Sequence, residues 1–104
     1  MASSGVLMKR DYLAELKRTV LAMFVGQPGK VFLFGSRARG THFPRSDVDI
    51  GILLSDPRAS TRITLLREQI ENLNIPYKVD VVNFAEVSPA FRENAIRSAE
   101  VWQE

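Results

Sequence analysis

The stretch LFGSRARGTHFPRSDVDIGILL, residues 33–54, joins two apolar segments through a glycine-serine turn and a basic loop. The first segment is VFLF, residues 31–34, which is short, apolar and bounded by glycine. The second is DVDIGILL, residues 47–54, where side chains of two kinds alternate. Such alternation is typical of a half-buried β-strand. We expect one face to carry Val48, Ile50, Ile52 and Leu54, and the other to carry Asp47, Asp49 and Gly51.

The segments around this stretch predict helices and one more strand. Apolar residues recur at helical spacing over residues 8–25 and again from Ser60 or Thr61, either of which could cap the helix, to about Leu73. A last helix is expected to start at Pro89, with an apolar side formed by Phe91, Ala95, Ala99 and Trp102. Residues 37–41 fit a helical turn, and YKVDVVNF, residues 77–84, fits a strand. This order predicts helices on one face of a small sheet, with the other face partly open.

Length and composition limit the classes of protein that the chain can represent. With 104 residues we expect a loose tail at 1–7 and a single domain at 8–104. The absence of cysteine excludes a disulfide scaffold and a thiol nucleophile, and it fits a cytoplasmic protein. No apolar stretch is long enough to cross a membrane. A net charge of +2 is too small to indicate nucleic-acid binding.

Three aspartates are the candidate catalytic residues. Asp47 and Asp49 would project from one face of a strand, and Asp80 interrupts the apolar segment KVDVV, where a lone charge is costly. If the two strands are neighbours, all three carboxylates can meet and bind a hard cation such as Mg²⁺. The alternative is structural: a turn residue, an exposed strand residue, and an acid paired with Lys78 or an arginine. The combination of all three favours the functional interpretation.

The glycine-serine turn suggests a phosphate site. A residue without Cβ at position 35 lets the backbone approach a phosphate, and Ser36 adds a hydroxyl donor. A plain strand-to-helix turn is the alternative. Neither the P-loop nor the dinucleotide-binding glycine pattern is present, because Thr41 stands where a P-loop requires lysine.

The spacing of these residues resembles a known signature. Gly35-Ser36, ten residues, and then Asp47-Val48-Asp49 resemble the G-S-x10-D-x-D pattern of the DNA polymerase β-like nucleotidyltransferase superfamily. GSRARG followed by RSDVDIGIL is similar to the minimal nucleotidyltransferase (MNT) family over nearly the whole chain. The resemblance implies an α+β nucleotidyltransferase fold with a small mixed sheet of three to four strands.

The resemblance also implies roles for individual residues. Asp47 and Asp49 would bind two Mg²⁺ ions, Asp80 would be the third carboxylate and the candidate base, and Gly35 and Ser36 would hold the phosphates of a nucleoside triphosphate such as ATP. The nearby arginines would neutralise the remaining phosphate charge, with Arg37 the first choice and Arg39 and Arg45 after it. Each arginine could instead pair with an aspartate and lock the loop.

The same resemblance implies a biological setting. So small a body leaves little surface for a second substrate, so we expect a partner protein to supply it. In the MNT family that partner is commonly a HEPN RNase toxin, and the MNT protein, its antitoxin, attaches AMP to a hydroxyl of the toxin. The alternatives are an antitoxin that acts by contact alone, and a small-molecule nucleotidyltransferase that acts as an oligomer.

Overall fold

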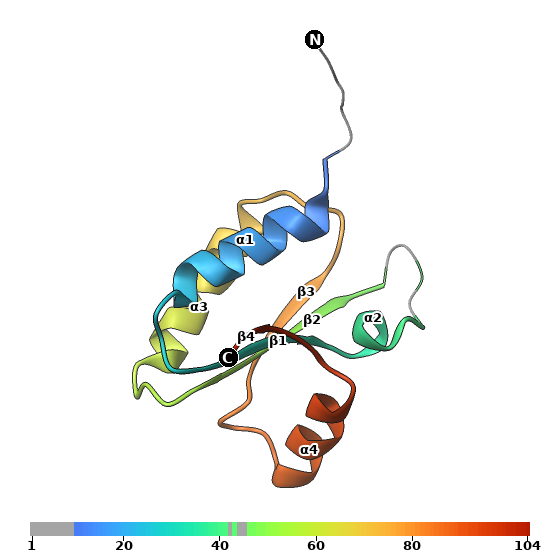
Figure 1. Ribbon diagram of the computed structural model, residues 1–104. Helices are drawn as coiled ribbons and strands as arrows, with labels where there is room; N and C mark the ends of the chain where they lie inside the picture. Colours follow the sequence, from blue (N-terminus) through green and yellow to red (C-terminus); the bar gives the residue numbers. More distant parts are fainter. Residues whose placement is uncertain (1–9, 42, 44–45) are drawn as a thin grey trace.

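The computed structural model describes residues 10–41, 43 and 46–104. The expected tail at 1–7, the first two residues of the expected first helix, and Arg45 lie outside this part of the chain. The elements are, in order, α1 (Tyr12–Phe24), β1 (Gly29–Phe34), α2 (Ser36–Arg39), β2 (Val48–Leu54), α3 (Ala59–Glu71), β3 (Val79–Asn83), α4 (Pro89–Arg97) and β4 (Glu100–Gln103) (Figure 1).

The strands form one mixed sheet in the order β3-β2-β1-β4. Strand β1 runs antiparallel to β2 and to β4, whereas β2 and β3 are parallel because α3 connects them. The expected α+β fold with a small mixed sheet is therefore confirmed.

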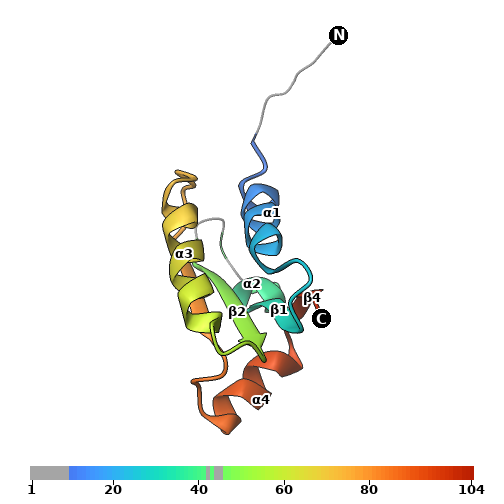
Figure 2. The same ribbon diagram turned by 90° about the vertical axis from the view of Figure 1, so that its left-hand side faces the viewer.

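One face of the sheet is closed by two helices. Helices α1 and α3 lie side by side over it (Figure 2). The expected alternation in β2 is confirmed, since its four aliphatic residues point into this core. The most deeply buried side chains of the core, all less than 2% exposed, are Leu16, Val20, Phe24, Val31, Val48, Ile50, Ile52, Ile63 and Leu66.

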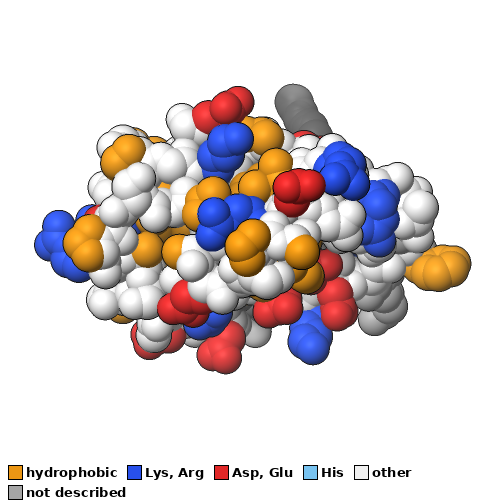
Figure 3. Space-filling model, turned by 90° about the horizontal axis from the view of Figure 1, so that it is seen from below, with side chains coloured by type: hydrophobic (Ala, Val, Ile, Leu, Met, Phe, Trp, Pro, Cys, Tyr) orange, Lys and Arg blue, Asp and Glu red, His pale blue; other side chains and the backbone are white. Residues whose placement is uncertain are grey.

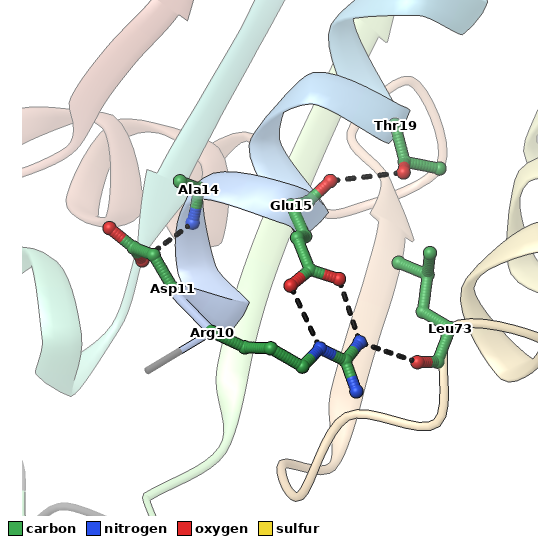
Figure 4. Close-up of polar contacts among 6 residues, drawn as sticks. All are labelled: Arg10, Asp11, Ala14, Glu15, Thr19 and Leu73. Carbon is green, nitrogen blue, oxygen red and sulfur yellow. Dashed lines mark hydrogen bonds and ion pairs between the residues drawn. The ribbon is translucent and has the colours of Figure 1, made fainter. Parts of the chain in front are cut away.

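Polar contacts fix the start of α1. The Asp11 carboxylate accepts a hydrogen bond of 3.0 Å from the backbone N–H of Ala14 and so caps the helix. Arg10 donates two hydrogen bonds to Glu15, at 3.0 and 2.7 Å, and a third to the Leu73 carbonyl at 3.2 Å (Figure 4). The last bond ties the beginning of α1 to the segment that follows α3.

The second face is covered by one helix, contrary to the expectation that all helices pack on one side. Helix α4 lies below the sheet in Figure 1, across from α1 and α3. Its residues Ala95 and Ile96 pack against an aromatic cluster formed by Phe32, Phe34 and Phe84. A Cβ at position 51 would collide with the rings of Phe32 and Phe84, so Gly51 leaves the space that the cluster fills.

Two helix ends also differ from expectation. Trp102 lies in β4 and not on the last helix, because the chain leaves α4 after Arg97 and pairs with the free edge of β1. Helix α3 begins at Ala59, before the expected Ser60 or Thr61; the Asp56 carboxylate accepts a 2.8 Å hydrogen bond from the N–H of Arg58 instead. Among the described helices, none has the length and apolar character needed to cross a membrane.

Candidate functional site

The register of β2 and β3 brings the three aspartates to the same end of one sheet face. Asp49 pairs directly with Asp80, and the N–H of Val48 donates a 2.9 Å hydrogen bond to the carbonyl of Lys78. Paired residues of parallel strands point to the same side, so Asp49 and Asp80 are neighbours. Asp47 precedes β2 by one residue. This is the face that α4 covers farther along the strands.

Electrostatics show that these carboxylates influence one another. Asp49 is partly buried, and burial is the main cause that raises its pKa. The negative charges of Asp80 and then Asp47 raise that pKa further, whereas Arg39 and Lys78 lower it. Asp47 and Asp80 themselves are exposed. The fold therefore holds an acid at a position where its charged form lacks full compensation.

The arrangement of the three carboxylates bears on their expected role as metal ligands. Within the described part of the chain, no three acidic or histidine side chains lie close enough together to hold one metal ion. Joint binding of a metal ion by Asp47, Asp49 and Asp80, completed by substrate phosphates, therefore stays a prediction. The structure brings the acids to one end of one face of the sheet.

Gly35 lies directly against this acid pair. Its φ of 78° and ψ of −156° fall in a region that only glycine adopts readily. A Cβ on this residue would collide with a carboxylate oxygen of Asp49. The sequence thus places glycine where the turn needs an unusual backbone and where the aspartate needs space. Ser36 follows as the first residue of α2.

Arg37 contacts the loop that leads to the acids. Its Nε and Nη2 donate hydrogen bonds of 3.2 and 3.1 Å to the carbonyl of Ser46, the residue before Asp47. Its guanidinium also lies 4.5 Å from the ring centroid of Tyr77, just before β3. These contacts fit the locking alternative for Arg37, with the backbone carbonyl of Ser46 as one partner, and direct phosphate contact stays a prediction.

A cavity of about 370 Å³ opens beside Gly35, between the α2 turn and α4. Arg39 lines it, together with Phe91, Asn94 and Ser98 from the last helix and its cap. From the sequence, Phe91 was assigned to the apolar side of the last helix, and Asn94 and Ser98 were not considered. Their spacing of three and four positions, which puts them on one side of a helix, is the signal that could have identified them.

The donor set fits a hard divalent cation. Magnesium prefers oxygen ligands and is commonly held by one or two carboxylates plus substrate phosphates, so a closed cage of three protein ligands is not required. Asp49 and Asp80 are register neighbours, and the raised pKa of Asp49 shows uncompensated negative charge that a cation would relieve. The residues present are therefore suitable ligands.

Comparison with known proteins gives a consistent assignment. The polymerase β nucleotidyltransferase family profile matches residues 19–103. A protein of Haemophilus influenzae named "Probable protein adenylyltransferase MntA" is 33% identical over 86 residues, which cover 83% of this chain and 74% of that protein.

Two solved structures share the fold. One, described as a minimal nucleotidyltransferase, superposes with a TM-score of 0.67 at 28% identity and covers 89% of this chain and 95% of its own. The other, a toxin-antitoxin crystal structure with AMP-PNP, gives a TM-score of 0.63 at 20% identity over 84% of this chain and 72% of its own, and it supports the fold alone. With the matched profile and the MntA relative, the chain belongs to the polymerase β-like nucleotidyltransferase family, in its minimal form.

Proposed function

We propose that this protein transfers a nucleoside monophosphate, AMP from ATP, to a hydroxyl group of a partner protein. The observation that carries the proposal is the juxtaposition of Gly35 with Asp49, which itself pairs with Asp80. A phosphate-binding turn beside paired carboxylates is what nucleotidyl transfer requires. The protein acceptor is supported by the similarity to the protein named as an adenylyltransferase.

The reaction balances as a substitution at phosphorus. The oxygen of the acceptor hydroxyl forms a new bond to the α-phosphorus, the bond between that phosphorus and the bridging oxygen breaks, and pyrophosphate leaves with the electron pair. The hydroxyl proton passes to the carboxylate of Asp80, which is exposed and therefore open to an incoming acceptor. Asp47, Asp49 and Asp80 would hold Mg²⁺, which when bound stabilises charge on the entering and leaving oxygens.

The remaining residues position the nucleotide. Gly35 lets the backbone approach the phosphates, and the Ser36 hydroxyl donates to a phosphate oxygen. Arg39 compensates phosphate charge, since it already lies near enough to Asp49 to lower that residue's pKa. Arg37 keeps the loop before Asp47 in place through the Ser46 carbonyl.

The acceptor we propose is a HEPN-type toxin, with this protein as its antitoxin in the cytoplasm, where ATP is available. The solved toxin-antitoxin neighbour carries AMP-PNP, and both it and this chain have the same fold. A macromolecular acceptor also agrees with the exposure of Asp47 and Asp80, which leaves this end of the sheet accessible to a large partner.

Transfer of label tests the proposal. We expect protein incubated with α-labelled ATP, Mg²⁺ and the partner encoded beside it to label that partner, and a Asp47→Ala/Asp49→Ala variant to fall to background. A matched control, Asp56→Asn, removes an acid that pairs with Arg62 away from the site and should keep transfer. Equal labelling by the double variant would overturn the proposal.

Two further outcomes separate the alternatives. If the double variant transfers nothing yet still neutralises the toxin, inhibition by contact accounts for the biology and the transfer step does not. If a small molecule accepts label without any protein partner, the acceptor class is wrong while the nucleotidyl transfer stands.

A further inference from the structure

The cavity beside Gly35 has an aromatic wall on α4 that the proposed transfer step does not use. Phe91 is 46% exposed although it contacts two members of the aromatic cluster. Its ring contacts Phe34 at a centroid distance of 6.2 Å and Phe84 at 5.7 Å. One part of the ring is thus braced by buried neighbours, while another part lines the cavity.

Polar groups stand next to this wall at helical spacing. Asn94 and Ser98 follow Phe91 by three and seven positions and line the same cavity. Within the described residues, no hydrogen bond engages the side chain of either one. An aromatic face beside an available amide is a combination that suits a planar heterocycle with donors and acceptors on its edge.

The cavity is continuous with the candidate phosphate site. Gly35 forms part of its wall and also abuts the carboxylate of Asp49, and Arg39 lines the cavity while acting on the same carboxylate. A nucleotide whose phosphates lie at the turn would therefore extend its base toward α4. The volume of about 370 Å³ is within the range of small-ligand pockets.

A second cavity, of about 450 Å³ along the edge of β3, is a weaker candidate for the base. It is lined by Asp80, Glu71, Tyr77 and Arg67, and Gly35 and Arg39 are not among its lining residues. Its place beside Asp80 suits the acceptor side of the reaction better than the nucleotide side.

We propose that the cavity between α2 and α4 is the nucleobase pocket, that Phe91 is the platform on which the base stacks, and that Asn94 selects adenine. An amide presents a donor and an acceptor side by side, which is the pairing that asparagine makes with the N6 and N7 positions of adenine. Guanine carries an acceptor at both corresponding positions and would leave the amide oxygen unpaired. This inference rests on the proposed function and assigns its base specificity.

The proposed nucleobase pocket can be tested by calorimetric titration of the full chain with Mg²⁺ and ATP, GTP or tripolyphosphate. Tripolyphosphate is the phosphate portion without a base. We expect ATP to bind more tightly than tripolyphosphate, and Phe91→Leu to weaken ATP binding about tenfold, the order expected for loss of one stacking contact. Binding of tripolyphosphate should not change in this variant. Phe91→Tyr keeps an aromatic face and should bind ATP as the unaltered protein does.

Matched variants separate a specific effect from general damage. Asn94→Ala should reduce the preference for ATP over GTP, whereas Gln69→Ala, another exposed amide but on α3, should leave that preference intact. Leu65→Ala is the control for Phe91, because Leu65 is similarly exposed, at 48%, on the opposite side of the sheet. Thermal unfolding followed by circular dichroism reports whether each variant is folded.

The outcomes distinguish this inference from the function beneath it. If Phe91→Leu and Asn94→Ala both leave ATP and GTP affinities within twofold while Asp47→Ala/Asp49→Ala abolishes ATP binding, the base pocket is wrong and the proposed function stands. If ATP binds no more tightly than tripolyphosphate, the base pocket is likewise wrong. If the unaltered protein binds neither ligand, both proposals fall together.

Discussion

The two faces of the sheet are built in different ways. The face under α1 and α3 is aliphatic and closed, with side chains such as Leu66 and Ile50 fully buried. The opposite face carries the aromatic cluster under α4 at one end and the aspartates at the other. Viewed from the side of α4, the surface mixes apolar side chains with charges of both signs (Figure 3).

The difference separates stability from function. Two helices supply one face with a continuous core, which contributes most of the hydrophobic stabilisation. A single short helix leaves part of the other face open, and charged groups can remain there without being sealed from water. Strand β2 contributes to both faces, because its alternate residues point to opposite sides of the sheet.

The largest stability effect should come from the closed face. Leu66→Ala removes a fully buried side chain and should lower the free energy of unfolding by about 2–5 kcal/mol. Ile96→Ala, in α4 and only partly buried, should cost no more than about half of that. Denaturant titration of both variants measures the difference. Equal losses would show that α4 seals its face as fully as α1 and α3 do theirs.

Replacement of Gly35 by alanine should have a larger effect on activity than the same replacement of Gly40, a glycine with a similar φ. Gly35→Ala forces a Cβ against Asp49 at a backbone geometry costing about 1–3 kcal/mol, and we expect transfer activity to be lost. Gly40 has a φ of 75° in the ordinary left-handed region, and no atom of the described residues lies within 4 Å of where its Cβ would stand. Gly40→Ala should therefore cost about 1 kcal/mol and retain activity. Loss of activity in both would point to backbone strain as the cause.

Variants of Arg37 and Tyr77 test whether the contacts that hold the loop before Asp47 support catalysis on the open face. Arg37→Gln and Tyr77→Leu should both lower kcat, by roughly tenfold, because each loosens the loop before Asp47. Tyr77→Phe keeps the ring and should preserve kcat. The double variant should be little worse than either single change, since the two residues act on one loop. A phosphate ligand would instead raise KM for ATP in Arg37→Gln and leave Tyr77→Leu unaffected.

The side chains of the closed face and the juxtaposition of the aspartates could be predicted from the sequence for the same reason. Alternation in residues 47–54 states which side chains share a face, and the parallel register that pairs Asp49 with Asp80 follows once β2 and β3 are neighbours. The Gly-Ser turn was identifiable because Gly35 directly follows an apolar strand, whereas the collision of its would-be Cβ with Asp49 was found only in the structure. These features depend on residue type and spacing, which the sequence contains.

Other features depend on tertiary packing that spacing does not encode. The apolar side of α4 shows that it packs but not on which face of the sheet. Trp102 continues a helical spacing, and a strand of four residues such as β4 is too short to reveal a period of two. One partner of Arg37 is a backbone carbonyl, and every residue has such a group.

The smallest stability effect should come from neutralising the partly buried Asp49. The pKa of Asp49 is raised in the folded protein, first by burial and then by Asp80 and Asp47, so the folded state binds its proton more tightly than the unfolded state. Stability should therefore fall as pH rises from below the ordinary aspartate value through the raised pKa, and the cost should be fully present at neutral pH. Asp49→Asn removes this cost, and its melting temperature at pH 7 without Mg²⁺ should be slightly higher than that of the unaltered protein. The difference in melting temperature between Asp49→Asn and the unaltered protein should close as the pH is lowered. Transfer activity should be lost in Asp49→Asn at any pH.

The control is Asp11→Asn, which changes a helix cap on the closed side and should not show this gain. A melting temperature for Asp49→Asn that is lower at pH 7 would mean that the charged carboxylate stabilises the fold, and the contrast between the faces would be weaker than the structure indicates.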